Sequence, residues 1–187
     1  MQTRKLALLI GAAAVGATLV ACGSTMTRPP ALPLPSASPV DLPAFMGRWY
    51  VIASIPTFLE KGAVDAVETY TLRPDGSIDI DFRYRRSPGG SEHQLGSRGF
   101  VQGGDNAVWG VQFIWPIKAD YRIAWLAPQG GQVIVARQKR DYVWIMARTP
   151  TVPDADYQQL VQRVGAMGYD TRELVRVPQS AGTAASR

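Results

Sequence analysis

The sequence predicts an all-β protein, an eight-stranded antiparallel up-and-down barrel with one C-terminal α-helix packed on its outside. From Gly47 onward, apolar and polar residues alternate with the period of two that is typical of β-strands. Turn residues separate eight such stretches, and only one later stretch has helical spacing. A sandwich of two sheets is compatible with the same periodicity and is the structural alternative.

The predicted strands are joined by short segments that suit hairpin turns. Arg73-Pro74-Asp75-Gly76 and Pro128-Gln129-Gly130-Gly131 supply the Gly, Pro and Asp residues that a reversal of the chain requires. Eight hairpin-linked strands favour a barrel, whose interior is just wide enough for side chains and one small ligand. The strands are predicted at Arg48–Ile55, Val64–Arg73, Ser77–Arg85, Gln94–Gln102, Ala107–Trp115, Asp120–Ala127, Gln132–Arg137 and Asp141–Ala147.

The predicted helix begins after Pro153. Asp154 and Asp156 lie in its first turn, where the positive end of the helix dipole stabilises carboxylates, and Gly168 is placed to end it. Its apolar residues fall at helical spacing, so one face must pack against the outside of the sheet. These apolar residues are Tyr157, Leu160, Val161, Val164 and Met167.

Residues 1–21 have the pattern of a secretory signal peptide. Arg4 and Lys5 precede an apolar run that is shorter than the ~20 residues of a membrane-spanning helix. The run ends in Leu19-Val20-Ala21-Cys22, which resembles the lipobox of bacterial lipoproteins. That resemblance implies cleavage before Cys22 and acylation of this cysteine with chains such as palmitate. Because Gly23 rather than Asp follows, it also implies a lipid anchor in the cell outer membrane, with the domain in the periplasm.

The rest of the chain is predicted to divide into a tether, one domain and a tail. Residues 22–43 carry six prolines among small and polar residues, a composition that favours an extended tether over a packed core. Residues 44–178 are long enough for one domain with a single core, and residues 179–187 are predicted to be a disordered tail. Cys22 is the only cysteine, so the domain contains no disulfide.

The charge of the chain argues against nucleic acid as a partner. The formal net charge is +5, and the basic residues are scattered rather than gathered in a stripe. The sequence therefore contains no basic stripe that interleaves with aromatic residues, as a nucleic-acid surface would require. A mild attraction to an anionic lipid surface is expected instead.

Two segments resemble sequence signatures of the lipocalin family. Gly47 to Ser54, GRWYVIAS, is similar to the first signature, and Tyr142 to Pro150, YVWIMARTP, is similar to the signature of the last strand. With Gly47 as the signature glycine, the resemblance implies that Arg148 lies across Trp49 and closes the floor of the barrel. A guanidinium stacked on an indole ring contributes ~0.5–2 kcal/mol.

Further segments resemble one branch of that family. TYTLRPDGSIDI, RDYVWIMARTPTV and GYD are similar to the bacterial outer-membrane lipoprotein lipocalins, which are close to apolipoprotein D and to plant temperature-induced lipocalins. The segment ADYRIAWLAP resembles the middle signature only loosely. The resemblance covers about residues 42–177, and it agrees with the separate lipobox pattern.

The alternation of the strands, set in the register of that family, predicts which side chains line a cavity. The lining is mostly apolar or aromatic, which suits an acyl chain. Glu68 and Arg122 are charged exceptions that pair, reach the wet mouth of the barrel, or show that the register is off by one. Arg122 is also a candidate contact for a lipid phosphate or carboxylate. The predicted lining consists of Val51, Ala53, Glu68, Tyr70, Ile80, Phe82, Val101, Trp109, Val111, Phe113, Arg122, Val135, Tyr142 and Trp144.

These patterns predict a lipid carrier rather than an enzyme. The resemblance implies that the protein binds, stores or transports a fatty acid or lysophospholipid for maintenance of the cell envelope. A lipocalin-like enzyme, or a carrier of another hydrophobic ligand such as a tetrapyrrole, is the alternative. The only thiol is the predicted anchor Cys22, and the only histidine, His93, has no Ser or Cys partner by motif. No cofactor or metal is expected, and a homodimer is an open alternative to a monomer.

Overall fold

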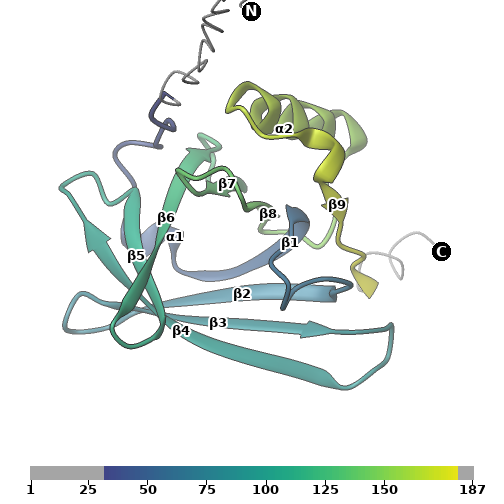
Figure 1. The fold of residues 1–187 in the computed structure, drawn as a ribbon, viewed down its shortest axis with the longest axis horizontal. Helices are drawn as coiled ribbons and strands as arrows, with labels where there is room; N and C mark the ends of the chain where they lie inside the picture. Colours follow the sequence, from purple (N-terminus) through teal and green to yellow (C-terminus); the bar gives the residue numbers. More distant parts are fainter. Residues whose placement is uncertain (1–31, 181–187) are drawn as a thin grey trace, which may run out of the picture. The chain divides into compact units, whose positions relative to one another are not determined.

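The computed structural model describes residues 32–180 and confirms the predicted all-β architecture. Eight antiparallel strands follow one another up and down, and each pairs with the next. β1 pairs with both β2 and β8, so the sheet closes into a ring and the sandwich alternative is excluded (Figure 1). The strands are β1 (Gly47–Ile55), β2 (Val64–Leu72), β3 (Ile78–Arg85), β4 (Glu92–Gln102), β5 (Val108–Ile114), β6 (Ile117–Leu126), β7 (Gln132–Ala136) and β8 (Val143–Ala147).

Every predicted strand is present, and its ends lie within three residues of the predicted ends. Three short elements are additional to the prediction. They are α1 (Leu42–Phe45), the 3-10 turn η1 (Thr171–Glu173) and β9 (Val175–Arg176). α1 lies under one end of the barrel and β9 pairs with β1, so both complete the barrel at places where the eight strands leave it open.

The long helix, α2 (Asp154–Ala166), packs on the outside of the barrel, as predicted (Figure 1). Tyr157 and Val164 of α2 are buried in an apolar cluster with outward side chains of the wall, including Ile134 and Ile145. A second cluster fills the interior of the ring. No helix within residues 32–180 is long and apolar enough to cross a membrane.

The segment before β1 packs on the barrel. Leu34 and Val40 are buried, and the N–H of Ala37 donates to a carbonyl of β6 at 2.7 Å. The prediction of an extended tether is therefore wrong from Leu32 to Pro43, because the apolar residues between the prolines find a surface to cover. Residues 22–31 of the predicted tether lie outside the described part of the chain.

The C-terminal segment fills a gap between β1 and β2. These two strands pair only over the first four residues of β1. Beyond that point β9 pairs with β1, and the side-chain amide of Gln179 donates to the carbonyls of Val51 at 2.9 Å and Ala66 at 3.0 Å. Ser180 bonds to β2 in turn. The predicted tail is therefore wrong at Gln179 and Ser180, whereas residues 181–187 lie outside the described part.

The barrel floor is closed by a guanidinium stacked on an indole ring. The guanidinium carbon of Arg148 lies 3.8 Å from the ring centroid of Trp49, and its Nη2 donates to the carbonyls of Ala44 at 2.8 Å and Phe45 at 3.0 Å. Gly47 has a φ of +88°, a left-handed conformation that favours glycine, where the chain passes from α1 into β1. Arg148 therefore ties α1 and β1 to the end of β8. The opposite end, where the loops β1–β2, β3–β4, β5–β6 and β7–β8 leave the strands, is the mouth.

Substitution of this floor pair has a predicted stability signature. Trp49→Ala should lower the free energy of unfolding by ~3–5 kcal/mol, because a fully buried ring is removed. Arg148→Ala should lower it by less. The double variant should lose less than the sum of the two single losses, because each group stabilises the other. Urea unfolding followed by circular dichroism measures all three losses.

A second stacked pair provides the matched control. The guanidinium carbon of Arg163 lies 4.6 Å from the ring of Trp125 on the outside of the barrel. Since Arg163 is exposed, the same cycle on this pair should give a much smaller coupling. Strictly additive losses for Trp49 and Arg148 would contradict a stabilising stack at the floor.

Candidate ligand-binding site in the barrel interior

The interior of the ring contains most of the side chains predicted to line a cavity. Glu68 is buried on β2, and Val101 and Tyr142 lie partly buried at the margin of the interior cluster. Contact of these side chains with a ligand stays a prediction. The remaining interior members of the predicted lining are Val51, Tyr70, Ile80, Phe82, Trp109, Val111, Val135 and Trp144.

Two predicted lining residues lie outside the interior because strand register shifts. A β-bulge between Val51 and Ala53 breaks the alternation of β1, and Ala53 joins the apolar cluster under α2. The pairing of β5 with β6 shifts after Val111, and Phe113 is exposed near the tip of that hairpin. The prediction that Ala53 and Phe113 line the cavity is therefore wrong.

Arg122 also lies outside the interior. Its Nε donates to Asp120 at 3.1 Å, whereas Tyr121 and Ile123 on either side belong to the interior cluster. The predicted register of β6 is off by one residue, because apolar side chains occupy both faces of this strand and hide the alternation. The predictions of Arg122 as a cavity residue and as a head-group contact inside the barrel are both wrong.

The closed end of the interior is packed with aromatic rings. The ring centroid of Phe45 lies 5.1 Å from that of Trp49, 5.4 Å from that of Tyr70 and 5.5 Å from that of Trp109. Tyr121 stacks on Trp109 at 5.3 Å, with the ring planes 12° apart. Because these rings fill the floor, a ligand in the interior would lie on their mouth side.

A buried polar cluster lies among these rings. The carboxyl group of Glu68 accepts from the hydroxyl of Tyr70, which is also bonded to the hydroxyl of Tyr121. Tyr121 donates to Glu68 over a longer distance of 3.4 Å. Desolvation, with a further contribution from the charge of Glu60, raises the pKa of Glu68 to about 8, so burial favours the neutral form of this carboxyl group. Burial likewise raises the pKa of Tyr121.

A second carboxyl group reaches the interior from the mouth. Glu60 lies in the β1–β2 loop, and its Oε1 accepts from the indole N–H of Trp144 on β8 at 3.2 Å. Its Oε2 accepts from the backbone N–H of Thr57 at 2.8 Å, and burial raises its pKa as well. The polar groups of this interior are thus carboxyl groups, phenol hydroxyls and an indole N–H. They suit a neutral polar group and disfavour an anion.

Three residues of this site were missed by sequence reasoning. Tyr121 follows from moving the register of β6 by one residue, since its partner Trp109 on β5 faces inward. Glu60 lies in a loop, where the period of a strand carries no information. Phe45 precedes the first predicted strand, and its place in the floor is revealed only by its ring contacts in the folded protein.

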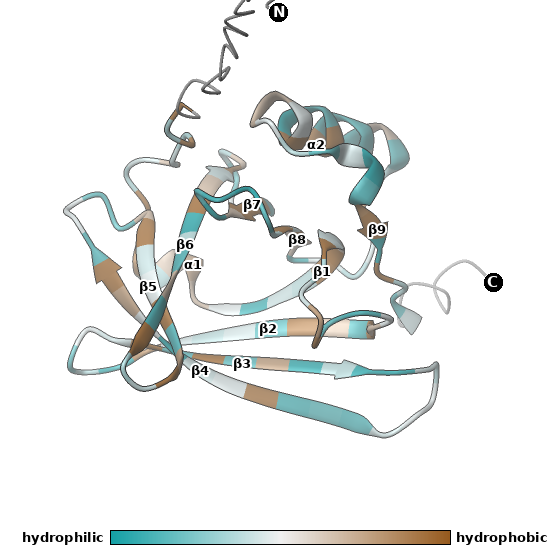
Figure 2. Ribbon diagram, viewed as in Figure 1, coloured by the Kyte–Doolittle hydropathy of each residue, from teal (hydrophilic) through white to brown (hydrophobic). Residues whose placement is uncertain are grey.

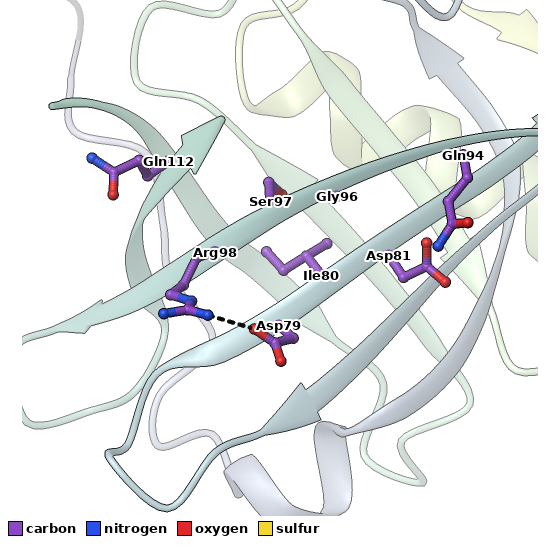
Figure 3. A pocket seen from close by; sticks show the side chains of 8 residues that line it. All are labelled: Asp79, Ile80, Asp81, Gln94, Gly96, Ser97, Arg98 and Gln112. Carbon is purple, nitrogen blue, oxygen red and sulfur yellow. Dashed lines mark ion pairs between the residues drawn. The ribbon is translucent and has the colours of Figure 1, made fainter. Parts of the chain in front are cut away.

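A shallow polar groove lies on the outer face of β3, β4 and β5 (Figure 3). Asp79 pairs with Arg98 at 3.4 Å and with Arg73 at 2.7 Å. Asp81 pairs with Arg83 at 2.8 Å. Because acidic and basic side chains neutralise each other across this face, it presents no excess charge to a ligand.

The raised pKa of Glu68 predicts that stability falls as the pH rises. The folded protein holds the proton of Glu68 up to about pH 8, whereas the unfolded chain releases it near the ordinary value of 4.5. The contribution of protonated Glu68 to the free energy of unfolding is therefore complete when the pH is below the ordinary pKa of 4.5. It is lost as the pH rises through the raised pKa of about 8. Between these limits, the free energy of unfolding should fall by up to ~1.4 kcal/mol per pH unit.

Glu68→Gln tests this prediction, because it keeps the shape of the side chain and removes the titration. Its free energy of unfolding, measured in urea between about pH 5 and pH 8, should depend on pH less steeply than that of the unaltered protein. The remaining slope is expected from Glu60, whose pKa is also raised. Equal slopes in the two proteins would count against a neutral Glu68.

Comparison with known proteins gives the relationship of this chain. A family model described as a lipocalin-like domain matches residues 40–179. Temperature-induced lipocalin-1 of Arabidopsis thaliana is 33% identical over 157 residues, covering 75% of this chain and 80% of the relative. Outer membrane lipoprotein Blc of Escherichia coli K12 is 30% identical over 169 residues, covering 90% of this chain and 94% of the relative. Apolipoprotein D of Mus musculus is 27% identical over 150 residues, covering 75% of this chain and 77% of the relative.

Solved structures share the fold at low sequence identity. The cockroach allergen Per a 4 aligns with a TM-score of 0.60 and 16% identity, covering 80% of this chain and 95% of the allergen. Lobster apocrustacyanin A1 aligns with a TM-score of 0.60 and 11% identity, covering 83% of this chain and 95% of the apocrustacyanin chain. The family match spans most of the chain and coincides with the closed barrel, the outer helix and the stacked floor pair. The chain belongs to the lipocalin family, in the branch that includes the bacterial outer membrane lipoproteins and apolipoprotein D.

Proposed function

We propose that this protein is a membrane-anchored lipocalin that binds, stores or transports a lipid of the fatty-acid or lysophospholipid class for maintenance of the cell envelope. Lipocalins bind small hydrophobic ligands and are carriers in general. The observation that carries the proposal is the interior wall, whose side chains are mainly apolar or aromatic. Such a wall stabilises an acyl chain by ~25 cal/mol per Å² of apolar surface removed from water.

The charged groups favour one orientation of the lipid. Glu68 in the interior and Glu60 at its entrance disfavour a carboxylate or phosphate, and Arg122 offers no cation there. At the mouth, Lys61 is exposed, and Arg86 donates to its carbonyl at 2.6 Å. The acyl chain therefore enters the interior, and an anionic head group stays at the mouth beside these cations.

The membrane anchor is proposed from Cys22, which lies outside the described residues. Its lipobox resemblance agrees with the likeness of the chain to a protein named as an outer membrane lipoprotein. One acyl chain binds a membrane only marginally, so a lasting anchor needs two or more chains. The proposed location is the outer membrane with the domain in the periplasm, and a homodimer stays a prediction.

The alternatives of an enzyme and a tetrapyrrole carrier receive no comparable support from the site. His93 stacks on Tyr84, with 5.2 Å between ring centroids, and both lie toward the mouth. No cluster of three or more His, Cys, Asp or Glu side chains that could hold a metal ion occurs in residues 32–180. The interior instead presents a wall suited to an acyl chain, so lipid binding is the function proposed.

The anchor is tested by Cys22→Ser. Loss of the thiol removes the acceptor of the diacylglyceryl group, so the variant should incorporate no labelled palmitate and should accumulate as an uncleaved or mislocalised precursor. Metabolic labelling followed by fractionation of the membranes measures both effects. A matched Ser24→Ala variant should be labelled normally, and palmitate labelling of the Cys22→Ser protein would refute the anchor.

The interior site is tested by two neighbouring substitutions on β5. Val111 is buried in the interior cluster, whereas Gln112 lines the groove on the outer face. Val111→Glu should weaken uptake of a fluorescent fatty acid by roughly tenfold or more, because a carboxylate replaces part of the apolar wall. Gln112→Glu should leave uptake unchanged, because successive side chains of a strand face opposite sides.

Circular dichroism must show that both variants are folded before their uptake is compared. If Val111→Glu does not fold, the neutral change Val111→Asn takes its place and should weaken uptake in the same direction. Equal losses from position 111 and position 112 in folded proteins would refute the interior as the lipid site.

A further inference from the structure

Apolar side chains are exposed at the tip of the β5–β6 hairpin. Ile114, Trp115 and Ile117 are 73%, 83% and 70% exposed, and Phe113 is 61% exposed. The hairpin turn lies at the mouth end of the barrel, and Figure 2 shows the brown of hydrophobic residues there. Phe58 of the β1–β2 loop, at the same end, is 77% exposed. Apolar side chains gathered on a surface in this way mark an interaction site.

The N-terminal segment enters the described domain at the mouth end too. The carbonyl of Leu32 accepts from Arg140 at 2.6 Å and from Gln138 at 3.4 Å. Both donors lie in the β7–β8 loop, residues 137–142. Cys22 precedes Leu32 by ten residues, which span at most roughly 35 Å when fully extended. A lipid anchor on Cys22 would therefore hold the mouth end near the membrane.

The loops at the mouth also carry excess positive charge. Arg86 and Arg140 donate to backbone carbonyls, which leaves their positive charge available to an anionic surface. The turns at the floor end contain one basic and two acidic residues, in 73–77, 103–107 and 127–131. The mouth loops contain five basic and two acidic residues, in 56–63, 86–91, 115–116 and 137–142.

We propose that the mouth end docks on a lipid bilayer with anionic head groups, with Trp115 and its apolar neighbours inserted at the boundary between head groups and acyl chains. Tryptophan is enriched at that depth, and apolar insertion combined with basic residues is a general way of binding such a surface. The proposal rests on the proposed anchoring of Cys22, because the anchor brings the same end of the barrel to the membrane. Docking in this position lets a lipid pass between the bilayer and the barrel interior without crossing water.

Fluorescent labels at the two ends of the barrel test the docking. Trp115→Cys and Gln129→Cys are made separately in the full, anchored protein, where acylation leaves Cys22 without a free thiol. Gln129 is the matched control, because it is exposed in the β6–β7 turn at the floor end. Each protein is labelled with a polarity-sensitive dye and reconstituted into phosphatidylcholine vesicles with or without phosphatidylglycerol. Some of the lipids carry nitroxide quenchers in their acyl chains.

The label at position 115 should be quenched by these lipids and shifted to the blue, more strongly with phosphatidylglycerol present. The label at position 129 should show neither change. Equal responses at the two positions would overturn the proposal. Concentration-dependent association without vesicles, abolished by Trp115→Ser, would also overturn it, because the tip would then be a contact between two copies of the chain.

Lipid uptake from two sources separates the docking surface from the ligand site. The double variant Trp115→Ser, Ile117→Ser should extract a fluorescent fatty acid from vesicles about tenfold more slowly. Its affinity for the same fatty acid added from free solution should be unchanged, as in the control Gln129→Ser. Equal losses from both sources would overturn the docking role. If neither the unaltered protein nor the variants take up lipid from either source, the proposed carrier function fails. The quenching experiment still decides whether the mouth docks on the bilayer.

Discussion

The closed barrel depends on β1, which must be hydrogen-bonded along both of its edges. One edge pairs with β8 from Tyr50 to Ile55, while the other is shared between β2 and β9. An open edge would leave unpaired backbone groups and a site for pairing with other chains. Gln179 bridges the two strands where they diverge, and it lies 128 residues from Val51 in the sequence. Closure of the ring therefore requires both ends of the domain to be in place.

A closed ring with a sealed floor makes the interior a low-dielectric space, and this governs the chemistry of its polar groups. A charged carboxylate at Glu68 would be strongly disfavoured there, so the group is held neutral and hydrogen-bonded to two tyrosines. Replacing this cluster with apolar residues would remove the penalty of burying polar atoms. Its presence is explained if it discriminates among ligands, because neutral donors and acceptors beside an apolar wall accept a neutral group and reject an anion.

The strands could be predicted because their period and turns are local properties of the chain. Trp49 and Arg148 could be paired from their motifs, although they lie 99 positions apart in the numbering. The errors arise where tertiary contacts override the local pattern. A bulge in β1 moves Ala53 to the outer face, and apolar residues on both faces of β6 conceal that Arg122 points outward. Gln179 reads as part of a polar tail until the gap that it fills is known.

The two ends of the barrel are chemically different, and only one of them offers a way into the interior. At the floor, aromatic rings and the side chain of Arg148 close the passage. At the mouth, apolar and basic residues surround the end from which the N-terminal segment departs. A lipid whose head group stays at the mouth would enter and leave through the same end. Under the proposed anchoring, exchange with a bilayer would depend on how closely the mouth approaches it. The anchor and the exposed hairpin would then both act on the transfer of the acyl chain between membrane and barrel.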